Sequence, residues 1–408
     1  MVQCYWGVLP ANLLVPLETQ LVILFAISIV MSGVALRRLP PLMALFAFPV
    51  FWTAAEFAID RYSPHGSYAS LAYAETAFTA GIQIASVFGL YSITFSLCLF
   101  ANAIAFLTYR RWISGSLGIA LCVLGVAYGY VRLSEPPGPQ VQVAALADAD
   151  SWHAESRAHS LKSELSAVDA YASAITAEHG TRVVVIPEGA IRMSERAQAV
   201  VLAPLAAAAR AAHAVVVAGT FVPQPAQNRA FAFFPDGRVI TYAKRHPLWP
   251  LETESPGHTS GYLGGGYATQ ICKDMDFVHS VRTTARMGVR LMIVPANDFG
   301  RDGYIHARMA VMEGVANGFA VVRSAFNGLE TISDAYGRVL ASASTIQPGM
   351  VVTQAVVPLG PGPTIYTHIG NVFAWLCIVA SIALGIAIAP FDFTRLRLQV
   401  VRLFEMRR

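Results

Sequence analysis

Residues 182–188 read RVVVIPE, and this short stretch decides the fold class of the second half of the chain. Four consecutive β-branched apolar residues, Val183–Ile186, are typical of a strand that is covered on both faces. The run ends abruptly at Pro187 and the charged Glu188. Ligands bind at the carboxyl ends of strands in α/β sheets, so Glu188 is a first candidate for a functional residue.

The same type of strand recurs on both sides of this stretch and alternates with helical patterns. Strands are predicted at 141–147, 214–220, 290–298, 319–325 and 328–334, with a further strand in 335–343. Residues 229–246 form two strands joined by a Pro-Asp-Gly turn. Helices are predicted at 161–177, 194–212, 277–287 and 305–317. The alternation predicts an α/β domain of two or four layers and about 220 residues, large enough for its own core.

The first third of the chain is apolar instead, as is a stretch near its end. Apolar residues make up 55% of the 408 residues and charged residues only 13%, where soluble proteins have roughly 25%. Residues 68–80 are moderately apolar and are interpreted as a re-entrant or interfacial segment. Glu56 lies inside an apolar stretch, where an ionisable side chain is costly, and is interpreted as functional or as near the interface. Stretches of about the length that crosses a bilayer occur at 13–36, 41–59, 82–107, 115–133 and 368–389.

Arginines between these stretches predict their orientation. The pairs Arg37-Arg38 and Arg110-Arg111, and the basic tail at the C-terminus, are expected in the cytoplasm by the positive-inside rule. The α/β part then lies outside, and the C-terminus inside. Proline- and glycine-rich linkers mark the expected domain boundaries. We expect a membrane domain of about four helices at 1–135, an extracytoplasmic domain at 136–360, and a final transmembrane helix with its tail at 361–408.

Two further polar residues follow predicted strands as Glu188 does. Lys244 follows VITYA, and Cys272 follows YATQI. A carboxylate, an ammonium and a thiol that converge at strand ends suit covalent catalysis. The lysine favours the thiolate, and the glutamate takes its proton and returns it to a leaving group. The ammonium and the backbone N–H of Lys273 would stabilise an oxyanion.

Each residue also has a plainer interpretation. A free cysteine is more often a buried apolar side chain, a glutamate after a strand is often a helix cap, and a lone lysine is usually solvated. Cys272 as half of a disulfide would need Cys4 as its partner, and no cysteine or histidine pair has the spacing of a zinc site. We therefore expect no metal and no cofactor. The net charge of +4 is too small to indicate nucleic acid.

The surrounding motifs resemble the nitrilase, or carbon-nitrogen hydrolase, superfamily. They are IPEGA, YAKRHPLWPLE, QICKDMDF and PANDFG, followed by HARMAVMEGVANGFAVVRSAFNG, in the order and spacing of that family. The resemblance implies a nitrilase-type αββα sandwich and a catalytic trio at Glu188, Lys244 and Cys272. It also implies an assisting glutamate, which Glu252 matches. We expect Asn297 to order a turn beside the site and His306 to support it by packing or hydrogen bonding.

The membrane stretches resemble one branch of this superfamily, the apolipoprotein N-acyltransferases, of which this chain is a shortened or divergent member. Residues 83–105, QIASVFGLYSITFSLCLFANAIA, and 127–133, AYGYVRL, carry this likeness. The branch implies a multi-pass protein of a bacterial inner membrane with its catalytic domain on the periplasmic side. Trp152 and Trp249 are expected to contact substrate.

The branch further implies an acyl chain that passes from phospholipid, through a thioester on Cys272, to the N-terminal amine of a lipoprotein. The sequence departs from the family at Lys273 and Asp274, where the family usually has tyrosine and glutamate, and in the short stretch 252–272. These departures favour an alternative, an amidase or acyltransferase that acts on another amine or amide. A catalytically inactive binding protein is the remaining alternative.

Overall fold

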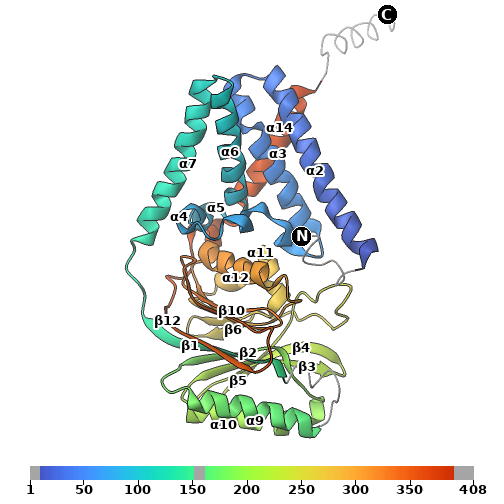
Figure 1. The fold of residues 1–408 in the computed structure, drawn as a ribbon, viewed down its shortest axis with the longest axis vertical. Coiled ribbons are helices and arrows are strands. Elements are labelled where there is room, and N and C mark those ends of the chain that lie inside the picture. Colours follow the sequence, from blue (N-terminus) through green and yellow to red (C-terminus); the bar gives the residue numbers. More distant parts are fainter. Residues whose placement is uncertain (1–9, 151–160, 390–408) are drawn as a thin grey trace, which may run out of the picture.

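A computed structural model describes residues 10–150 and 161–389, in which a bundle of long helices stands on an α/β portion (Figure 1). Among the described residues, four helices are long and apolar enough to cross a membrane. A shorter apolar helix, α14 (Val372–Ile388), runs back through the bundle and packs against α3. The four long helices are α2 (Ala11–Arg38), α3 (Pro41–Tyr62), α6 (Tyr91–Thr108) and α7 (Trp112–Leu133).

The stretch 82–107, predicted as one continuous span, is broken in the structure. Two short helices, α4 (Thr79–Ile82) and α5 (Ala85–Phe88), precede Gly89, and the long helix begins only at Tyr91. Gly89 has φ +80, and a side chain there would collide with the ring of Tyr366. A left-handed backbone and a close contact both require glycine, so the helix stops at this point.

Short helices fill the space between the bundle and the α/β portion. They are η1 (Gly66–Ala69) and η2 (Leu71–Glu75), and Glu56 of α3 anchors them. Glu56 is only 4% exposed and accepts hydrogen bonds from Ser70 Oγ at 2.6 Å and from the backbone N–H of Leu71 at 3.0 Å. It also accepts one from Thr94 Oγ1 of α6 at 2.7 Å. Three hydrogen bonds to this one buried carboxyl group hold η2 against α3 and α6.

The α/β portion consists of two sheets, each of six strands among the described residues, between two layers of helices (Figure 1). The first sheet has the order β12-β1-β2-β3-β4-β5, and the second β11-β10-β9-β8-β7-β6. Helices α9 (Leu161–Ala177) and α10 (Gln198–Ala211) cover the first sheet, and α11 (Val278–Ala285) and α12 (Gly303–Asn317) cover the second. The predicted αββα sandwich is confirmed.

The strands are close to those expected, with two additions. The sequence patterns do not predict the short β6, which pairs with β7, or β12, which pairs antiparallel with β1 along its whole length. The bounds are β1 Gln140–Asp148, β2 Val183–Arg192, β3 Val215–Pro223, β4 Ala226–Phe233, β5 Val239–Ala243, β6 Tyr262–Gly264, β7 Tyr267–Thr269, β8 Leu291–Asn297, β9 Ala320–Phe326, β10 Leu329–Ser333, β11 Val339–Ser344 and β12 Met350–Pro358.

The apolar run in β2 has the physical basis that its sequence indicates. Val184 and Ile186 pack against the layer of α9 and α10, while Val183 and Val185 pack between the two sheets. Successive side chains of a strand point to opposite faces, so a strand covered on both faces is apolar at every position. All four side chains are fully buried.

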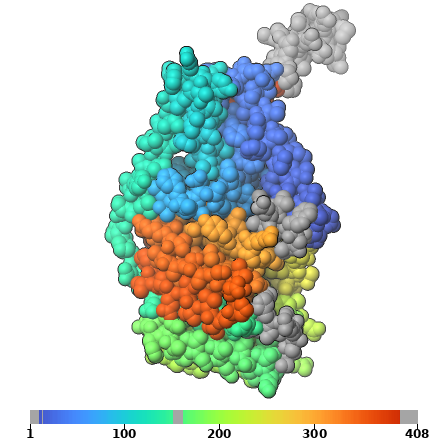
Figure 2. Space-filling view, in the orientation of Figure 1, coloured from blue at the N-terminus to red at the C-terminus, as the bar shows by residue number. Residues whose placement is uncertain are grey.

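The helix layer on the outer face of the second sheet also packs against the membrane bundle. Met309, Met312 and Val315 of α12 form one apolar cluster with Ile82 and Ile93. Figure 2 shows the two portions in contact along a broad front, with the light-blue segment resting on the orange one. This contact places the short segments η1 and η2 beside the end of the second sheet.

Candidate active site

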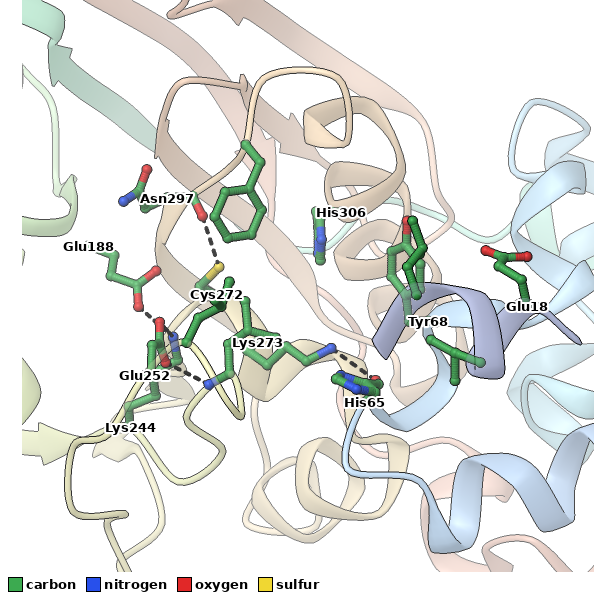
Figure 3. A pocket seen from close by; sticks show the side chains of 15 residues that line it. Glu18, His65, Tyr68, Glu188, Lys244, Glu252, Cys272, Lys273, Asn297 and His306 are labelled. Atoms are coloured by element: carbon green, nitrogen blue, oxygen red, sulfur yellow. Dashed lines mark hydrogen bonds and ion pairs between the residues drawn. The ribbon is translucent and has the colours of Figure 1, made fainter. Parts of the chain in front are cut away.

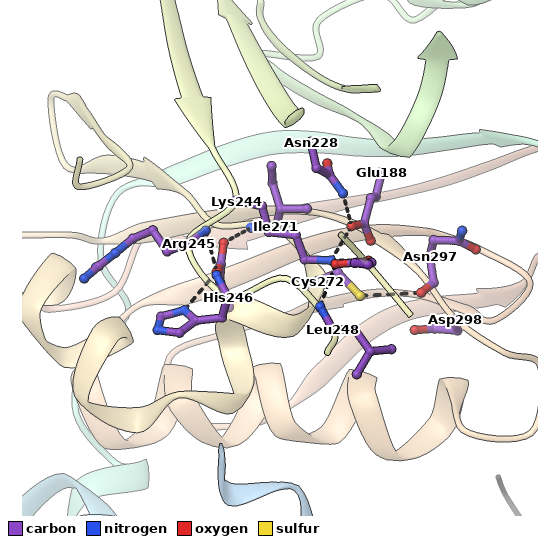
Figure 4. Close-up of polar contacts among 12 residues, drawn as sticks. Glu188, Asn228, Lys244, Arg245, His246, Leu248, Ile271, Cys272, Asn297 and Asp298 are labelled. Atoms are coloured by element: carbon purple, nitrogen blue, oxygen red, sulfur yellow. Dashed lines mark hydrogen bonds and ion pairs between the residues drawn. The ribbon is translucent and has the colours of Figure 1, made fainter. Parts of the chain in front are cut away.

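Glu188, Lys244 and Cys272 meet at one end of the sandwich, between the two sheets (Figure 4). Glu188 lies on β2 and Lys244 directly follows β5, both in the first sheet, whereas Cys272 follows β7 of the second. Lys244 Nζ donates to Glu188 Oε1 at 2.6 Å. The thiol of Cys272 donates to the carbonyl oxygen of Asn297, at the end of β8, with 3.5 Å between sulfur and oxygen.

The ammonium of Lys244 is buried between two carboxylates. Lys244 is 2% exposed, and its Nζ also donates to Glu252 Oε1 at 2.7 Å. The other oxygen of Glu252 accepts from the backbone N–H of Leu248 at 2.7 Å, and Asn228 Nδ2 donates to Glu188 Oε1 at 2.6 Å. A buried charge is tolerated only when it is paired and hydrogen-bonded, as each of these is.

Burial and pairing set the protonation of the three groups. Burial raises the pKa of Glu188 above its ordinary value, although the Lys244 ammonium opposes this shift. Burial disfavours the charge on Lys244, but Glu188 and Glu252 outweigh it and raise the pKa of the ammonium. Burial and the Glu188 carboxylate raise the pKa of Cys272. The resting site therefore holds a neutral thiol beside a carboxyl group whose raised pKa makes it a stronger base for the thiol proton.

Cys272 begins a tight turn with a strained backbone. It is the first residue of η4 (Cys272–Asp276) and has φ +43, a left-handed conformation that is unfavourable for a side chain other than glycine. Asp274, which is fully buried, accepts hydrogen bonds from the backbone N–H groups of Arg245 at 3.0 Å and His246 at 2.8 Å. The turn of Cys272 is thereby tied to the segment that follows Lys244. The sequence marks Asp274 only as a departure from the family and does not predict its role, because its partners lie far away in the chain.

Lys273 and His306 face the membrane bundle. The side chain of Lys273 points away from Cys272, and its Nζ donates to the carbonyl oxygen of His65 at 2.9 Å and to Asp276 Oδ2 at 2.5 Å (Figure 3). The ring nitrogens of His306 lie 3.6 Å from Asp276 Oδ1 and 3.2 Å from Asp302 Oδ2. Burial opposes a charge on His306, but the two aspartates outweigh it and raise its pKa to about 9.

A cavity of about 170 Å³ connects the trio to the membrane bundle (Figure 3). At one end it is lined by Glu188, Lys244 and Cys272, and at the other by Leu14, Leu17 and Glu18 of α2. Leu17 and His65 also line an adjoining groove of about 500 Å³ between α2 and α3. The cavity is also lined by Leu248, Leu251, Phe299 and Tyr68. These residues lacked any local signal, because they come from separate parts of the chain.

The structure gathers most of the residues singled out from the sequence. The two tryptophans differ from the rest, since Trp249 is 55% exposed and lines the adjoining groove, while Trp152 lies outside the described residues. Of the residues selected from the sequence, those that line the main cavity are Glu188, Lys244, Glu252, Cys272, Lys273, Asn297 and His306.

Comparison with known proteins places the chain in a family. The model of the carbon-nitrogen hydrolase family matches residues 143–357, more than half of the chain. The carbon-nitrogen hydrolase of Helicobacter pylori G27, a solved structure, is 18% identical with a TM-score of 0.45, covering 54% of this chain and 89% of that one.

Two curated relatives are named apolipoprotein N-acyltransferase. The protein of Geobacter metallireducens is 26% identical over 381 residues, which cover 83% of this chain and 73% of that protein. The protein of Shewanella oneidensis is 28% identical over 163 residues, which cover 39% of this chain and 30% of that protein. The first match extends well beyond the α/β portion. The chain belongs to the carbon-nitrogen hydrolase family, in the branch of these relatives, as a member whose α/β portion is joined to apolar helices of membrane-spanning length.

Proposed function

We propose that the protein is an acyltransferase of the bacterial inner membrane, which moves an acyl chain from a phospholipid to the N-terminal amine of a lipoprotein. The observation that carries the proposal is the cavity shared by Cys272 and by Leu14 and Leu17 of α2. A hydrolase of small soluble amides has no need of a site that reaches a helix of membrane-spanning length. The names of the curated relatives support the same function.

The first half of the reaction forms a thioester. Glu188 takes the proton of the Cys272 thiol, and the thiolate attacks the ester carbonyl of the phospholipid. The Lys244 ammonium, with the backbone N–H of Lys273, stabilises the oxyanion that forms. As the intermediate collapses, the carbon–oxygen bond breaks, and Glu188 gives its proton to the departing oxygen of the lysophospholipid. The acyl chain then remains on sulfur.

The second half transfers the acyl chain to nitrogen. The neutral amine of the acceptor attacks the thioester carbonyl, and Lys244 again stabilises the oxyanion. Glu188 takes a proton from the nitrogen while the carbon–sulfur bond breaks, and this proton returns to the thiolate of Cys272. An amide and the free enzyme result. Glu252 holds Lys244 in place during both halves, because it binds the same ammonium at 2.7 Å.

The proposed arrangement in the membrane follows from the arginine pairs of the sequence. Residues 136–360 lie on the periplasmic side, and residues 1–135 and 361–408 hold the membrane helices and the cytoplasmic tail. Both substrates are then anchored at the outer surface of the inner membrane, where the groove between α2 and α3 meets the cavity.

The decisive experiment is intact-mass analysis of purified protein after incubation with phospholipid vesicles. We expect a mass increase of one acyl chain on the wild type, located on Cys272 by peptide mapping and removed by hydroxylamine. Cys122→Ala, which removes a thiol outside the cavity, should keep the adduct, and Cys272→Ala should lose it. A diacylated lipopeptide should then discharge the adduct and gain one acyl chain. An adduct equally present in Cys272→Ala would overturn the proposal.

The alternative, an amidase or a transferase for another amine, is favoured by one observation. Lys273 stands where the family usually has tyrosine, and its side chain binds the membrane bundle. If this alternative is correct, small amides will release ammonia in the presence of the wild type and not of Cys272→Ala. The diacylated lipopeptide will then remain unmodified.

A further inference from the structure

The turn that begins at Cys272 is held from two sides. Inside the α/β portion, Asp274 binds the backbone beyond Lys244. On the opposite side, Lys273 crosses to the membrane bundle and donates to the carbonyl oxygen of His65 at 2.9 Å. Lys273 is 5% exposed and His65 is 8% exposed, so water does not compete freely for this contact.

Two further contacts join the same two segments, and a third holds Lys273 within η4. Lys273 Nζ donates to Asp276 Oδ2 of its own turn at 2.5 Å, whereas Ser67 Oγ of η1 donates across to the carbonyl oxygen of Asp276 at 2.8 Å. Gly66, with φ +62, packs so closely that a side chain there would collide with that same carbonyl. The segment η1 of the bundle therefore fits directly against the end of η4.

Strain in the nucleophile turn gives these contacts a role. Cys272 has φ +43, and a backbone in this conformation persists only where its surroundings fix it. A buried ammonium that lost its partners would be costly, so Lys273 couples the position of the turn to that of the bundle. The hydrogen bonds that Glu188, Lys244 and Cys272 make among the described residues stay within the α/β portion.

We propose that Lys273 is a positioning residue, which holds the sulfur of Cys272 in its reactive place from the membrane bundle, and that η1 is thereby a working part of the active site. The proposal rests on the proposed role of Cys272 as the nucleophile. Lys273, which stands where the family usually has tyrosine, would then let the membrane bundle fix the catalytic turn as well as anchor the enzyme.

The test compares Lys273→Met with Lys162→Met, which removes an exposed lysine far from the site in sequence. The full chain in detergent is acylated at Cys272 by a short-chain p-nitrophenyl ester, which needs no path through the membrane helices. We expect Lys273→Met to lower the acylation rate about tenfold to a hundredfold, the usual effect of a small displacement of a reacting atom. Lys162→Met should match the wild type, and Lys273→Arg should lie closer to the wild type than Lys273→Met.

The pH profile distinguishes positioning from a general loss of structure. In the wild type, the rate should follow the joint ionisation of Cys272 and Glu188. In Lys273→Met, the midpoint of the pH–rate profile should move toward the pKa of a free thiol, near pH 8.5. A rate and a profile equal to those of the wild type would overturn the proposal.

A second pair of variants tests the bundle side without touching the catalytic turn. Gly66→Ala should reproduce the effect of Lys273→Met, because the new methyl group pushes on Asp276. Gly237→Ala is the matched control, since Gly237 also has a positive φ, +90, but nothing lies within 4 Å of the added carbon. Equal rates in Gly66→Ala and Gly237→Ala would contradict the proposal.

Failure of the proposed function is separable from failure of this inference. If the wild type forms no acyl adduct, the function proposed above fails. Alkylation of Cys272 by iodoacetamide, followed by peptide mass spectrometry across pH, then decides the inference alone. A profile shared by the wild type, Lys273→Met and Gly66→Ala would overturn the positioning role, and a difference confined to the last two would support it.

Discussion

Lys244 Nζ lies 2.6 Å from Glu188 Oε1, and the two side chains are only 2% and 6% exposed. Such a pair is a weak contributor to stability, because the cost of removing two charges from water cancels much of their attraction. An apolar pair of similar volume would often be at least as stable. The ion pair is therefore better explained by chemistry at the adjacent thiol than by stability.

Lys244→Met should separate stability from activity when it is combined with a second substitution. Alone, it leaves the carboxylates of Glu188 and Glu252 together without their cation, and removal of one partner of a buried pair costs about 3–5 kcal/mol. Adding Glu188→Gln removes one of these charges, so the melting temperature should recover in part. Acylation of Cys272 should stay abolished in both variants. Recovery of acylation in the double variant would contradict the proposed roles.

Two histidines that line the cavity should give stability opposite slopes with pH. Asp276 and Asp302 raise the pKa of His306 from 6.5 to about 9, so its contribution is present below pH 6.5 and is lost as the pH rises to 9. Burial and the Lys273 ammonium lower the pKa of His65 from 6.5 to about 4, so its contribution is present above pH 6.5 and is lost as the pH falls to 4. The shift of His306, which is almost fully buried, corresponds to about 3 kcal/mol of unfolding free energy.

Thermal unfolding in detergent between pH 4 and pH 9 checks this prediction. His306→Gln should flatten the decline on the alkaline side only, and His65→Gln the decline on the acid side only. His65→Gln leaves the backbone carbonyl that binds Lys273 in place. Identical pH curves for the wild type and both variants would show that neither histidine is shifted as described.

The sequence predicts those features of this protein that depend on neighbouring residues. The run Val183–Ile186 indicates a strand covered on both faces, and the polar residues after each such run indicate a site at the strand ends. Glu188, Lys244 and Cys272 could be selected for this reason. Their motifs then resemble those of the family whose model matches the chain.

Features that depend on contacts between distant residues are missing from such a prediction. Gly89 ends a helix because the ring of Tyr366 occupies the space of a side chain, and nothing near Gly89 in the sequence indicates this. The partners of Asp274 and Lys273 lie 28 and 208 residues away in the chain. Lys273 binds the backbone carbonyl of His65, and every residue type has such a carbonyl, so the sequence cannot indicate this contact. The wall of the cavity formed by α2 could not be assigned for the same reason.

The buried pair of Arg323 and Asp298 should be needed to keep Asn297 in place. Arg323 Nη1 donates to Asp298 Oδ2 at 3.0 Å, and both side chains are almost fully buried. Arg323→Met leaves a buried carboxylate without its partner, which costs about 3–5 kcal/mol. The acylation rate should also fall, because the carbonyl of Asn297, the residue before Asp298, accepts the thiol of Cys272.

Melting temperature and acylation rate measured side by side test this prediction. The exposed pair of Arg238 and Asp236 provides the control, and Arg238→Met should change neither quantity measurably. Adding Asp298→Asn to Arg323→Met should recover part of the melting temperature, because the uncompensated charge is gone. A stable and fully active Arg323→Met would show that this pair does not support the site.

The cavity wall formed by α2 should border the passage through which the acyl chain of a phospholipid reaches Cys272. Leu17 lines both the cavity at Cys272 and the groove between α2 and α3, so a larger side chain there narrows the passage between them. Leu17→Trp should lower acylation by phospholipid about tenfold or more, because the ester carbonyl no longer reaches its place. Acylation by a short p-nitrophenyl ester should be unchanged. Val15→Trp is the matched control, since Val15 is 51% exposed on the same helix and lines neither space.

Kinetics with both acyl donors separate a blocked path from a damaged site. A blocked path raises KM for phospholipid and leaves kcat/KM for the short ester intact. A damaged site lowers kcat/KM for both donors. Leu17→Ala should leave both donors reactive, because a smaller side chain widens the passage. If Leu17→Trp slows the two donors equally, or if Val15→Trp matches it, the acyl chain reaches Cys272 by another route.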